Sequence, residues 1–176
     1  MLRRVQDKIV MTIGKDCVIH PSVVLDAPIF KLYFVEGKPY RRAIDKVLMT
    51  NIGNDVHIGA NVSIEAGFKR GTIINDHVWI DNNVLIGHDV VLGERVCISG
   101  STIVAGAVTI GDDSFVGVGV TIKPEVTIGK RCFIGAGCVV YKDIPDGMVV
   151  RNKMELVMRE NKFYPPNSEH IYPKTL

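Results

Sequence analysis

The sequence has few aromatic residues and lacks any long apolar run. Aromatic side chains make up 7% of the 176 residues, and tryptophan occurs once. No segment approaches the roughly 20 consecutive apolar residues that a membrane-spanning helix needs. The N-terminal stretch has no continuous apolar segment long enough for a secretory signal peptide. We therefore expect neither membrane insertion nor secretion.

A long block of like charge and paired cysteines are also missing. The formal net charge is +2, which argues against nucleic acid or an anionic membrane as the main partner. The four cysteines, Cys17, Cys97, Cys132 and Cys138, form no Cys-x-x-Cys pair, so a zinc or redox motif is not expected. A reduced cytoplasmic protein with one domain fits these features best.

A six-residue repeat dominates the sequence. From Ile74 to Val140 every sixth residue is aliphatic, which gives twelve consecutive anchors. The residue four places after each anchor is small or apolar, and glycine often follows the anchor directly. Fixed periods of this kind are the signature of solenoid proteins. The same register appears earlier, at Ile13 and Ile52, so eighteen hexads predict about six coils.

Each hexad predicts a short strand followed by a corner. Val84, Leu85 and Ile86 alternate in, out and in, as residues of a β-strand do. The next three residues, Gly87 to Asp89, turn a corner, where we expect glycine for its freedom to adopt unusual backbone angles. Three strands and three corners make a triangular coil of eighteen residues. The predicted fold class is therefore all-β, with a parallel β-helix across residues 1–150.

Two interruptions break the repeat, and it stops after Ile144. A four-residue insertion lies near residues 69–73. A longer excursion covers about residues 28–50, where FKLYFV and YRRAI flank the turn-like EGKP, and this pattern indicates a hairpin. Residues 151–176 are expected to form a short helix across 153–161 and an extended tail, which together would cap the last coil.

One corner carries a candidate catalytic histidine. His88 lies in the middle of its corner, and Gly106 occupies the same place one coil later. An imidazole beside a backbone N–H with no side chain suits acyl transfer, which needs a base and an oxyanion donor. Asp89, directly beside His88, is a candidate modulator of that base. From spacing alone, a merely polar corner residue is the alternative. Lys123 and Lys142 lie on later corners, either solvated or near coenzyme phosphates.

From about residue 52 to residue 141 the sequence resembles the hexapeptide-repeat acyltransferases of amino-sugar metabolism. IDNNVLIGHDVVLG resembles a pattern of the UDP-3-O-acylglucosamine N-acyltransferases, and IEAGFKRGTII has the length and the Gly67 and Thr72 landmarks of their preceding segment. In the similar UDP-4-amino-sugar N-acetyltransferases an acidic residue follows the histidine, as Asp89 does. The resemblance implies a left-handed coil, a homotrimer, acetyl-CoA as acyl donor and a nucleotide-linked amino sugar as acceptor.

The resemblance also implies roles for individual residues. It makes His88 the general base, Asp89 its modulator and Gly106 the donor to the thioester carbonyl. The positions that it implies for the coenzyme groove are Cys97, Gly106, Val118 and Ala136. Lys123, on the corner below Gly106, is added as a coenzyme contact from its position alone. The landmarks that it implies near the acceptor are Asp81, Asn82 and Glu65.

Several departures from the family pattern bear on the acceptor. Glu65, Ala66 and Gly67 stand where the lipid A branch has Asp-Arg-Gly, and that branch has a longer C-terminal helical extension than the one expected here. Together these departures favour short-chain transfer from acetyl-CoA over long-chain transfer from acyl carrier protein. Both branches usually carry an N-terminal domain that helps bind the sugar nucleotide, whereas this chain begins almost directly with the repeat. The excursion is then the candidate nucleotide site, through stacking or phosphate contacts of Tyr33, Phe34, Tyr40, Arg41 and Arg42. An apolar hairpin covering the flank of the β-helix is an equal alternative.

Two other activities remain compatible with the sequence, whereas a metal site does not. A sugar O-acetyltransferase would use the same base on a hydroxyl, and a non-catalytic β-helix would serve as an assembly subunit. Some trimeric β-helices are zinc carbonic anhydrases, but that resemblance needs a histidine five residues after one of those present, and Gly93 stands five residues after His88. No metal is expected.

Overall fold

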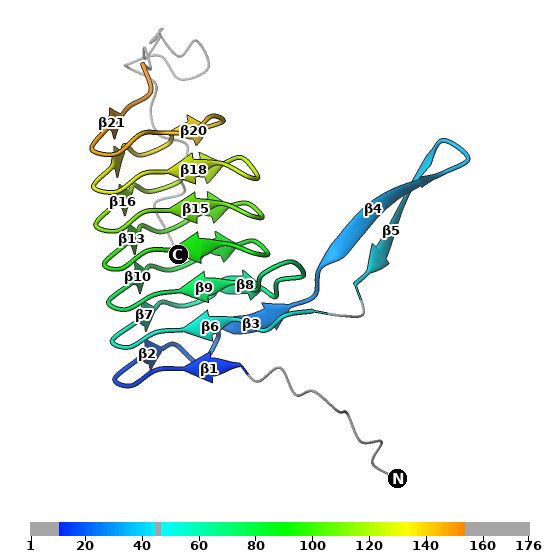
Figure 1. Cartoon of the computed structure of the whole chain (residues 1–176), viewed down its shortest axis with the longest axis horizontal. Helices are drawn as coiled ribbons and strands as arrows, with labels where there is room; N and C mark the ends of the chain where they lie inside the picture. The colour runs from blue at the N-terminus through cyan, green and yellow to red at the C-terminus, as the bar shows by residue number, and fades with distance from the viewer. Residues whose placement is uncertain (1–10, 45–46, 154–176) are drawn as a thin grey trace, which may run out of the picture.

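The computed structural model describes residues 11–44 and 47–153, which form a stack of coils with one projecting hairpin (Figure 1). Every regular element in these residues is a β-strand, and all the strands of the stack are parallel. The predicted all-β solenoid of about six coils is therefore confirmed. The helix predicted across 153–161 and the tail beyond it lie outside the described residues, apart from residue 153 itself.

Three parallel sheets form the faces of the solenoid. In spatial order, the first sheet contains β1 (Thr12–Ile13), β6 (Asn51–Ile52), β9 (Ile73–Ile74), β12 (Val91–Leu92), β15 (Thr109–Ile110) and β18 (Thr127–Ile128). The second contains β2 (Val18–Ile19), β7 (His57–Ile58), β10 (Trp79–Ile80), β13 (Cys97–Ile98), β16 (Phe115–Val116), β19 (Phe133–Ile134) and β21 (Val149–Val150). The third contains β3 (Val24–Ala27), β8 (Ser63–Glu65), β11 (Leu85–Ile86), β14 (Ile103–Val104), β17 (Thr121–Ile122) and β20 (Val139–Val140).

The hexad anchors point inward and form the core. Ile86, Leu92 and Ile98 are completely buried, one from each sheet. Neighbouring coils pair in an eighteen-residue register, as in Leu85 with Ile103, so each anchor packs on the equivalent anchors above and below. Stacked strands satisfy each other's backbone groups at a spacing of about 4.8 Å. The strict period of the sequence therefore fixes both the core and the strand register.

The glycine after each anchor is explained by close packing between coils. Positive φ angles occur two residues later, at the last residue of each corner, which is usually not glycine; Asp89 (58°), Arg95 (56°) and Ala107 (61°) are examples. A Cβ on Gly93, in contrast, would lie 2.6 Å from the backbone nitrogen of Asp112 in the next coil. The expectation that these glycines supply unusual backbone angles was therefore wrong.

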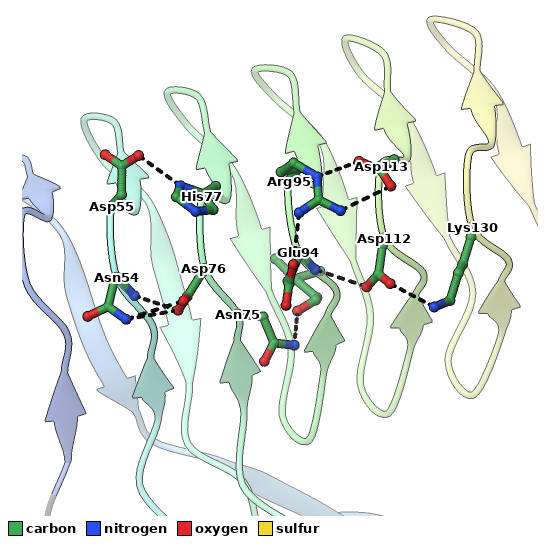
Figure 2. A network of polar contacts seen from close by, with 11 residues as sticks. Asn54, Asp55, Asn75, Asp76, His77, Glu94, Arg95, Asp112, Asp113 and Lys130 are labelled. Carbon is green, nitrogen blue, oxygen red and sulfur yellow. Dashed lines mark hydrogen bonds and ion pairs between the residues drawn. The ribbon is translucent and has the colours of Figure 1, made fainter.

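The three corners, named here by the sheets they join, stack into columns along the solenoid. The first corner joins the first sheet to the second, the second corner joins the second to the third, and the third corner joins the third back to the first. In the first corner a polar side chain from one coil caps a backbone N–H of the coil before it (Figure 2). The N–H of Asn54 donates to Asp76 Oδ1 (2.7 Å), and the N–H of Glu94 donates to Asp112 Oδ1 (3.1 Å).

These corner caps follow one rule. The capped N–H belongs to the middle residue of a corner, and the acceptor is the side chain of the middle residue one coil later. Asp112, which caps Glu94, is itself held by Lys130 Nζ of the following coil at 2.7 Å (Figure 2). Where the middle residue one coil later has no acceptor, a cap of this kind is absent.

The excursion is an antiparallel hairpin of β4 (Phe30–Val35) and β5 (Lys38–Ala43). Its two turn residues, Glu36 and Gly37, have φ angles of 50° and 74°, as a tight two-residue hairpin turn requires. The predicted hairpin is confirmed. It extends away from the stacked coils instead of covering their flank (Figure 1).

Candidate active site

The third corner collects both chain insertions and the candidate base. The hairpin leaves the solenoid between β3 and β6, and a loop at residues 66–72 (the 66–72 loop) leaves it between β8 and β9. His88 lies between β11 and β12, and Gly106 lies between β14 and β15. The two interruptions of the repeat and the candidate base therefore share one edge of the solenoid.

His88 and Asp89 form a hydrogen-bonded pair. His88 Nδ1 lies 3.0 Å from Asp89 Oδ2; the side chain of His88 is 30% exposed, whereas that of Asp89 is 1% exposed. An ionised carboxylate can only accept hydrogen bonds, so Nδ1 must be the protonated ring nitrogen. The neutral imidazole then keeps its free lone pair on Nε2. This is the tautomer that a general base needs.

Asp89 is held as an anion by the 66–72 loop. Its Oδ1 accepts hydrogen bonds from the backbone N–H groups of Phe68 (3.1 Å), Lys69 (2.9 Å), Arg70 (2.9 Å) and Gly71 (3.2 Å). Burial raises the pKa of Asp89, but the hydrogen bonds from Arg70, Lys69 and His88 outweigh burial and place the pKa below the ordinary value of 3.8. Hydrogen bonds to the charged form have this effect, so Asp89 is ionised at neutral pH.

The lowered pKa of Asp89 predicts a loss of stability at acid pH. Because the folded-state pKa lies below the unfolded value of 3.8, the stabilisation is present above the unfolded pKa and is lost as the pH falls through the folded pKa. We expect the free energy of unfolding of Asp89→Asn to fall less steeply than that of the unmodified protein below about pH 4. Urea unfolding at a series of pH values measures this, and equal acid slopes for the two proteins would contradict it.

The imidazole of His88 lies directly over Gly106. A Cβ built on Gly106 would meet His88 Nε2 first and would lie 2.6 Å from Cε1 and 2.8 Å from Cδ2. The N–H of Ala107 donates to the His88 carbonyl at 2.7 Å, which fixes the two corners against each other. Only glycine leaves room for the ring at this position.

The N–H of Gly106 is left uncapped. Gly106 is the middle residue of its corner, and the middle residue one coil later is Pro124, which has no side-chain acceptor. Gly106 is buried, and its N–H has no hydrogen-bond acceptor among the described residues. This donor is therefore available to an oxygen atom of a ligand that approaches His88.

Two further side chains adjoin His88. Glu65 Oε2 accepts a hydrogen bond from the backbone N–H of His88 at 3.0 Å. Glu65, which the sequence placed near the acceptor sugar, therefore helps to fix the corner of His88. The ring of Phe68 lies 4.8 Å from the imidazole, measured between centroids. Sequence reasoning did not single out Phe68, because its position depends on the path of the 66–72 loop. Lys123 and Lys142 are exposed in the same corner column on later coils.

Other predicted residues lie in the second corner. Asp81, Asn82, Val118 and Ala136 stack there, separated from the column of His88 by the third sheet. The side-chain oxygen of Asn82 already caps the N–H of Ala60 at 2.7 Å, which gives it a structural task. One chain therefore does not bring these residues together with His88.

Cys97 lies on the outer surface of the second sheet. It pairs in register with Trp79 on one side and Phe115 on the other. Burial, followed by the nearby charge of Asp81, raises the pKa of the Cys97 thiol. A protonated thiol is a poor nucleophile, so Cys97 can serve as a contact surface and not as a reacting group.

The predicted nucleotide-binding residues lie on the hairpin, away from the His88 corner. Tyr40 and Arg41 are exposed on β5. Tyr33 pairs with Tyr40 in the hairpin register, and its side chain is outside what the structure describes. The hairpin extends away from the coils (Figure 1), and its strands β4 and β5 pair only with each other among the described strands.

Residues 11–44 and 47–153 contain neither a metal-binding cluster nor a membrane-spanning helix. No three side chains of histidine, cysteine, aspartate or glutamate come together there in an arrangement that would hold a metal ion. No helix long and apolar enough to cross a membrane occurs in the same residues.

Two segments of the chain match known repeat families. Residues 107–142 match the bacterial transferase hexapeptide family (six repeats), and residues 49–87 match the hexapeptide repeat of succinyl-transferase. The chain therefore carries the hexapeptide repeat, and the resemblance predicted from its motifs is confirmed at this level.

The relatives that are similar in sequence are named UDP-3-O-acylglucosamine N-acyltransferases. The chain is 42% identical over 82 residues to the probable mitochondrial UDP-3-O-acylglucosamine N-acyltransferase 2 of Arabidopsis thaliana, and 45% identical over 73 residues to the UDP-3-O-acylglucosamine N-acyltransferase of Acinetobacter baumannii. These regions cover 46% and 41% of this chain but only 26% and 20% of the two relatives. The chain thus spans between a fifth and about a quarter of the length of the relatives that it matches.

Solved structures share the fold over a larger part of the chain. A UDP-N-acetylglucosamine acyltransferase from Bacteroides fragilis is similar with a TM-score of 0.69 and 26% identity, covering 80% of this chain and 53% of that protein. The corresponding enzyme from Campylobacter jejuni gives a TM-score of 0.61 at 24% identity, covering 75% of this chain and 56% of that protein. The latter likeness concerns the fold alone.

Proposed function

We propose that this chain is a coenzyme A-dependent N-acyltransferase that acetylates the amino group of a nucleotide-linked sugar. The observation that carries the proposal is the imidazole of His88 held over Gly106, whose N–H has no hydrogen-bond acceptor among the described residues. A base and an oxyanion donor on adjacent coils are the two groups that acyl transfer from a thioester requires.

The reaction follows from this geometry. His88 Nε2 removes a proton from the sugar amine as the amine nitrogen attacks the thioester carbonyl carbon. The carbonyl oxygen becomes an oxyanion and accepts the hydrogen bond of the Gly106 N–H. Collapse of this intermediate forms the amide and breaks the C–S bond. The imidazolium then returns its proton to the departing thiolate, so the products are the acetylated sugar and free coenzyme A.

The groove for the coenzyme is proposed to lie between two copies of the chain in a homotrimer. The outer rows of the second and third sheets carry exposed apolar side chains, including Trp79, Phe133, Ile103 and Val139. Apolar rows of this kind mark surfaces that are covered in an assembly. A neighbouring chain would then bring Cys97, Val118 and Ala136 toward a His88 that they do not reach within one chain.

A nucleotide-linked amino sugar is proposed as acceptor on two grounds. The relatives in sequence are named as acting on a UDP-linked acylglucosamine. The hairpin presents exposed Tyr40 and Arg41, which suit stacking on a base and contact with a phosphate. Since the hairpin extends away from its own coils, it is proposed to serve the site of a neighbouring copy.

A screen of thiol release tests the proposed function. The protein is incubated with acetyl-CoA and a panel of UDP- and dTDP-linked amino sugars, matched sugars with a hydroxyl in place of the amine, and acyl carrier protein as an alternative donor. We expect thiol release with acetyl-CoA and at least one amino sugar. Release only with the hydroxyl sugars would indicate O-acetylation instead. Calorimetric titration that detects no binding of acetyl-CoA would favour a non-catalytic assembly subunit.

A further inference from the structure

The 66–72 loop is an insertion that folds over Asp89. The corner cap between Glu94 and Asp112 joins residues eighteen apart, whereas the cap across this loop joins Asn54 and Asp76, which are 22 apart. The extra length is used locally, because four successive N–H groups of the loop converge on Asp89 Oδ1.

Arg70 fastens this loop to the two coils of the candidate site. Its Nε donates to the Asp89 carbonyl at 2.8 Å, in the coil of His88. Its Nη2 donates to Thr109 Oγ1 at 3.2 Å, in the coil of Gly106. At the other end of the loop, Gly67 forms a pair of backbone hydrogen bonds with Leu48 at the return from the hairpin (2.6 and 2.8 Å). The loop is therefore fixed at both ends.

We propose that Arg70 is a positioning residue for the His88–Asp89 pair. By fixing the 66–72 loop, Arg70 keeps four N–H donors on one carboxylate oxygen of Asp89, so that the other oxygen faces His88 Nδ1. The ring is then held as the tautomer with its lone pair on Nε2, over Gly106. The kinetic consequence rests on the proposed function, whereas the tautomer of His88 does not.

A purely structural role for Arg70 makes a different prediction, and the chain offers a matched control. Arg95 also links two coils, through Asp113 of the next coil (2.6 Å) and Glu94 beside it (2.8 Å), but it lies in the first corner (Figure 2). If Arg70 only tied coils together, loss of either arginine would have the same effects.

The test compares Arg70→Ala, Arg70→Lys and Arg95→Ala by NMR of protein labelled with ¹⁵N at the histidine rings. In the unmodified protein and in Arg95→Ala we expect the His88 signals of a single tautomer protonated on Nδ1. In Arg70→Ala we expect a mixture of both tautomers, and in Arg70→Lys an intermediate pattern. With an active acceptor, kcat of Arg70→Ala should fall by roughly 10- to 100-fold with KM unchanged, and added guanidine should restore part of it.

The outcomes separate the two proposals. If the unmodified protein transfers no acyl group, the proposed function fails, and the ring-nitrogen signals still decide the role of Arg70. The positioning role is overturned if Arg70→Ala retains the single tautomer, or if Arg70→Ala and Arg95→Ala change the His88 signals equally. If Arg70→Ala does not fold, Arg70→Lys decides the question. The positioning role is then overturned if Arg70→Lys shows the same single tautomer as the unmodified protein.

Discussion

Replacing Pro124 by aspartate is expected to lower turnover by roughly 10²- to 10³-fold, the usual effect of losing one oxyanion donor. Position 124 relates to Gly106 as Asp112 relates to Glu94, where the carboxylate caps the backbone N–H. Lys142 follows one coil later, as Lys130 follows Asp112 in the existing cap. An aspartate at 124 would therefore occupy the Gly106 N–H and remove it from catalysis.

Pro124→Ala is the matched control for this substitution. Alanine also removes the proline ring but has no acceptor, so the Gly106 N–H stays free and turnover should remain close to that of the unmodified protein. Urea unfolding should show Pro124→Asp to be more stable than Pro124→Ala by about 0.5–1.5 kcal/mol, the net value of one hydrogen bond. Normal turnover in Pro124→Asp would exclude Gly106 as the oxyanion donor.

Replacing His88 by alanine should lower turnover by roughly 10²- to 10⁴-fold, the contribution of a positioned general base. The fold should remain intact, since the His88 side chain is partly exposed and packs over a corner outside the core. The measurement is kcat with the best acceptor from the thiol-release screen, together with urea unfolding to verify the fold.

The chain provides a second histidine–aspartate pair as the control for His88. His77 Nδ1 lies 2.9 Å from Asp55 Oδ2 in the first corner (Figure 2), whereas Gly106 lies in the third corner, between β14 and β15. His77 has a φ of 60°, so His77→Asn suits its backbone conformation. This variant should keep full turnover. Equal losses in His77→Asn and His88→Ala would show that the effect comes from the fold and not from the base.

The sheets and their register could be predicted because the repeat is strict. An anchor every six residues and a coil every eighteen leave one way to stack the strands, and Ile86, Leu92 and Ile98 are buried as that pattern requires. The role of the glycines could not be read in the same way. The close approach of Gly93 to Asp112 is a contact between coils, whereas the prediction considered only the backbone of one residue.

The site was predictable where it depends on the eighteen-residue period and not where it depends on the insertion. His88 and Gly106 are eighteen residues apart and meet accordingly. Pro124 lies another eighteen residues on, one coil after Gly106. That Pro124 leaves the Gly106 N–H without a cap becomes clear only from the corner caps in the structure. The contacts of Asp89 with the 66–72 loop depend on a local path that no repeat specifies.

The eighteen-residue period also determines where the positions implied for the coenzyme groove lie. Val118 and Ala136 lie 30 and 48 residues after His88, which is twelve more than a whole number of coils. They therefore fall in the second corner, and only a second chain can bring them beside the third corner. The proposed groove therefore depends on the proposed assembly of several copies.

The most direct measurement is the infrared carbonyl stretch of acetyl-CoA, labelled with ¹³C at the thioester carbonyl, when it binds to the protein. A hydrogen bond from the Gly106 N–H should move this band to lower frequency in the unmodified protein and in His88→Ala, whose donor is intact. The shift should be absent in Pro124→Asp. A bound thioester whose band does not move in the unmodified protein, or moves equally in Pro124→Asp, would contradict an acyl-transfer site built on His88 and Gly106.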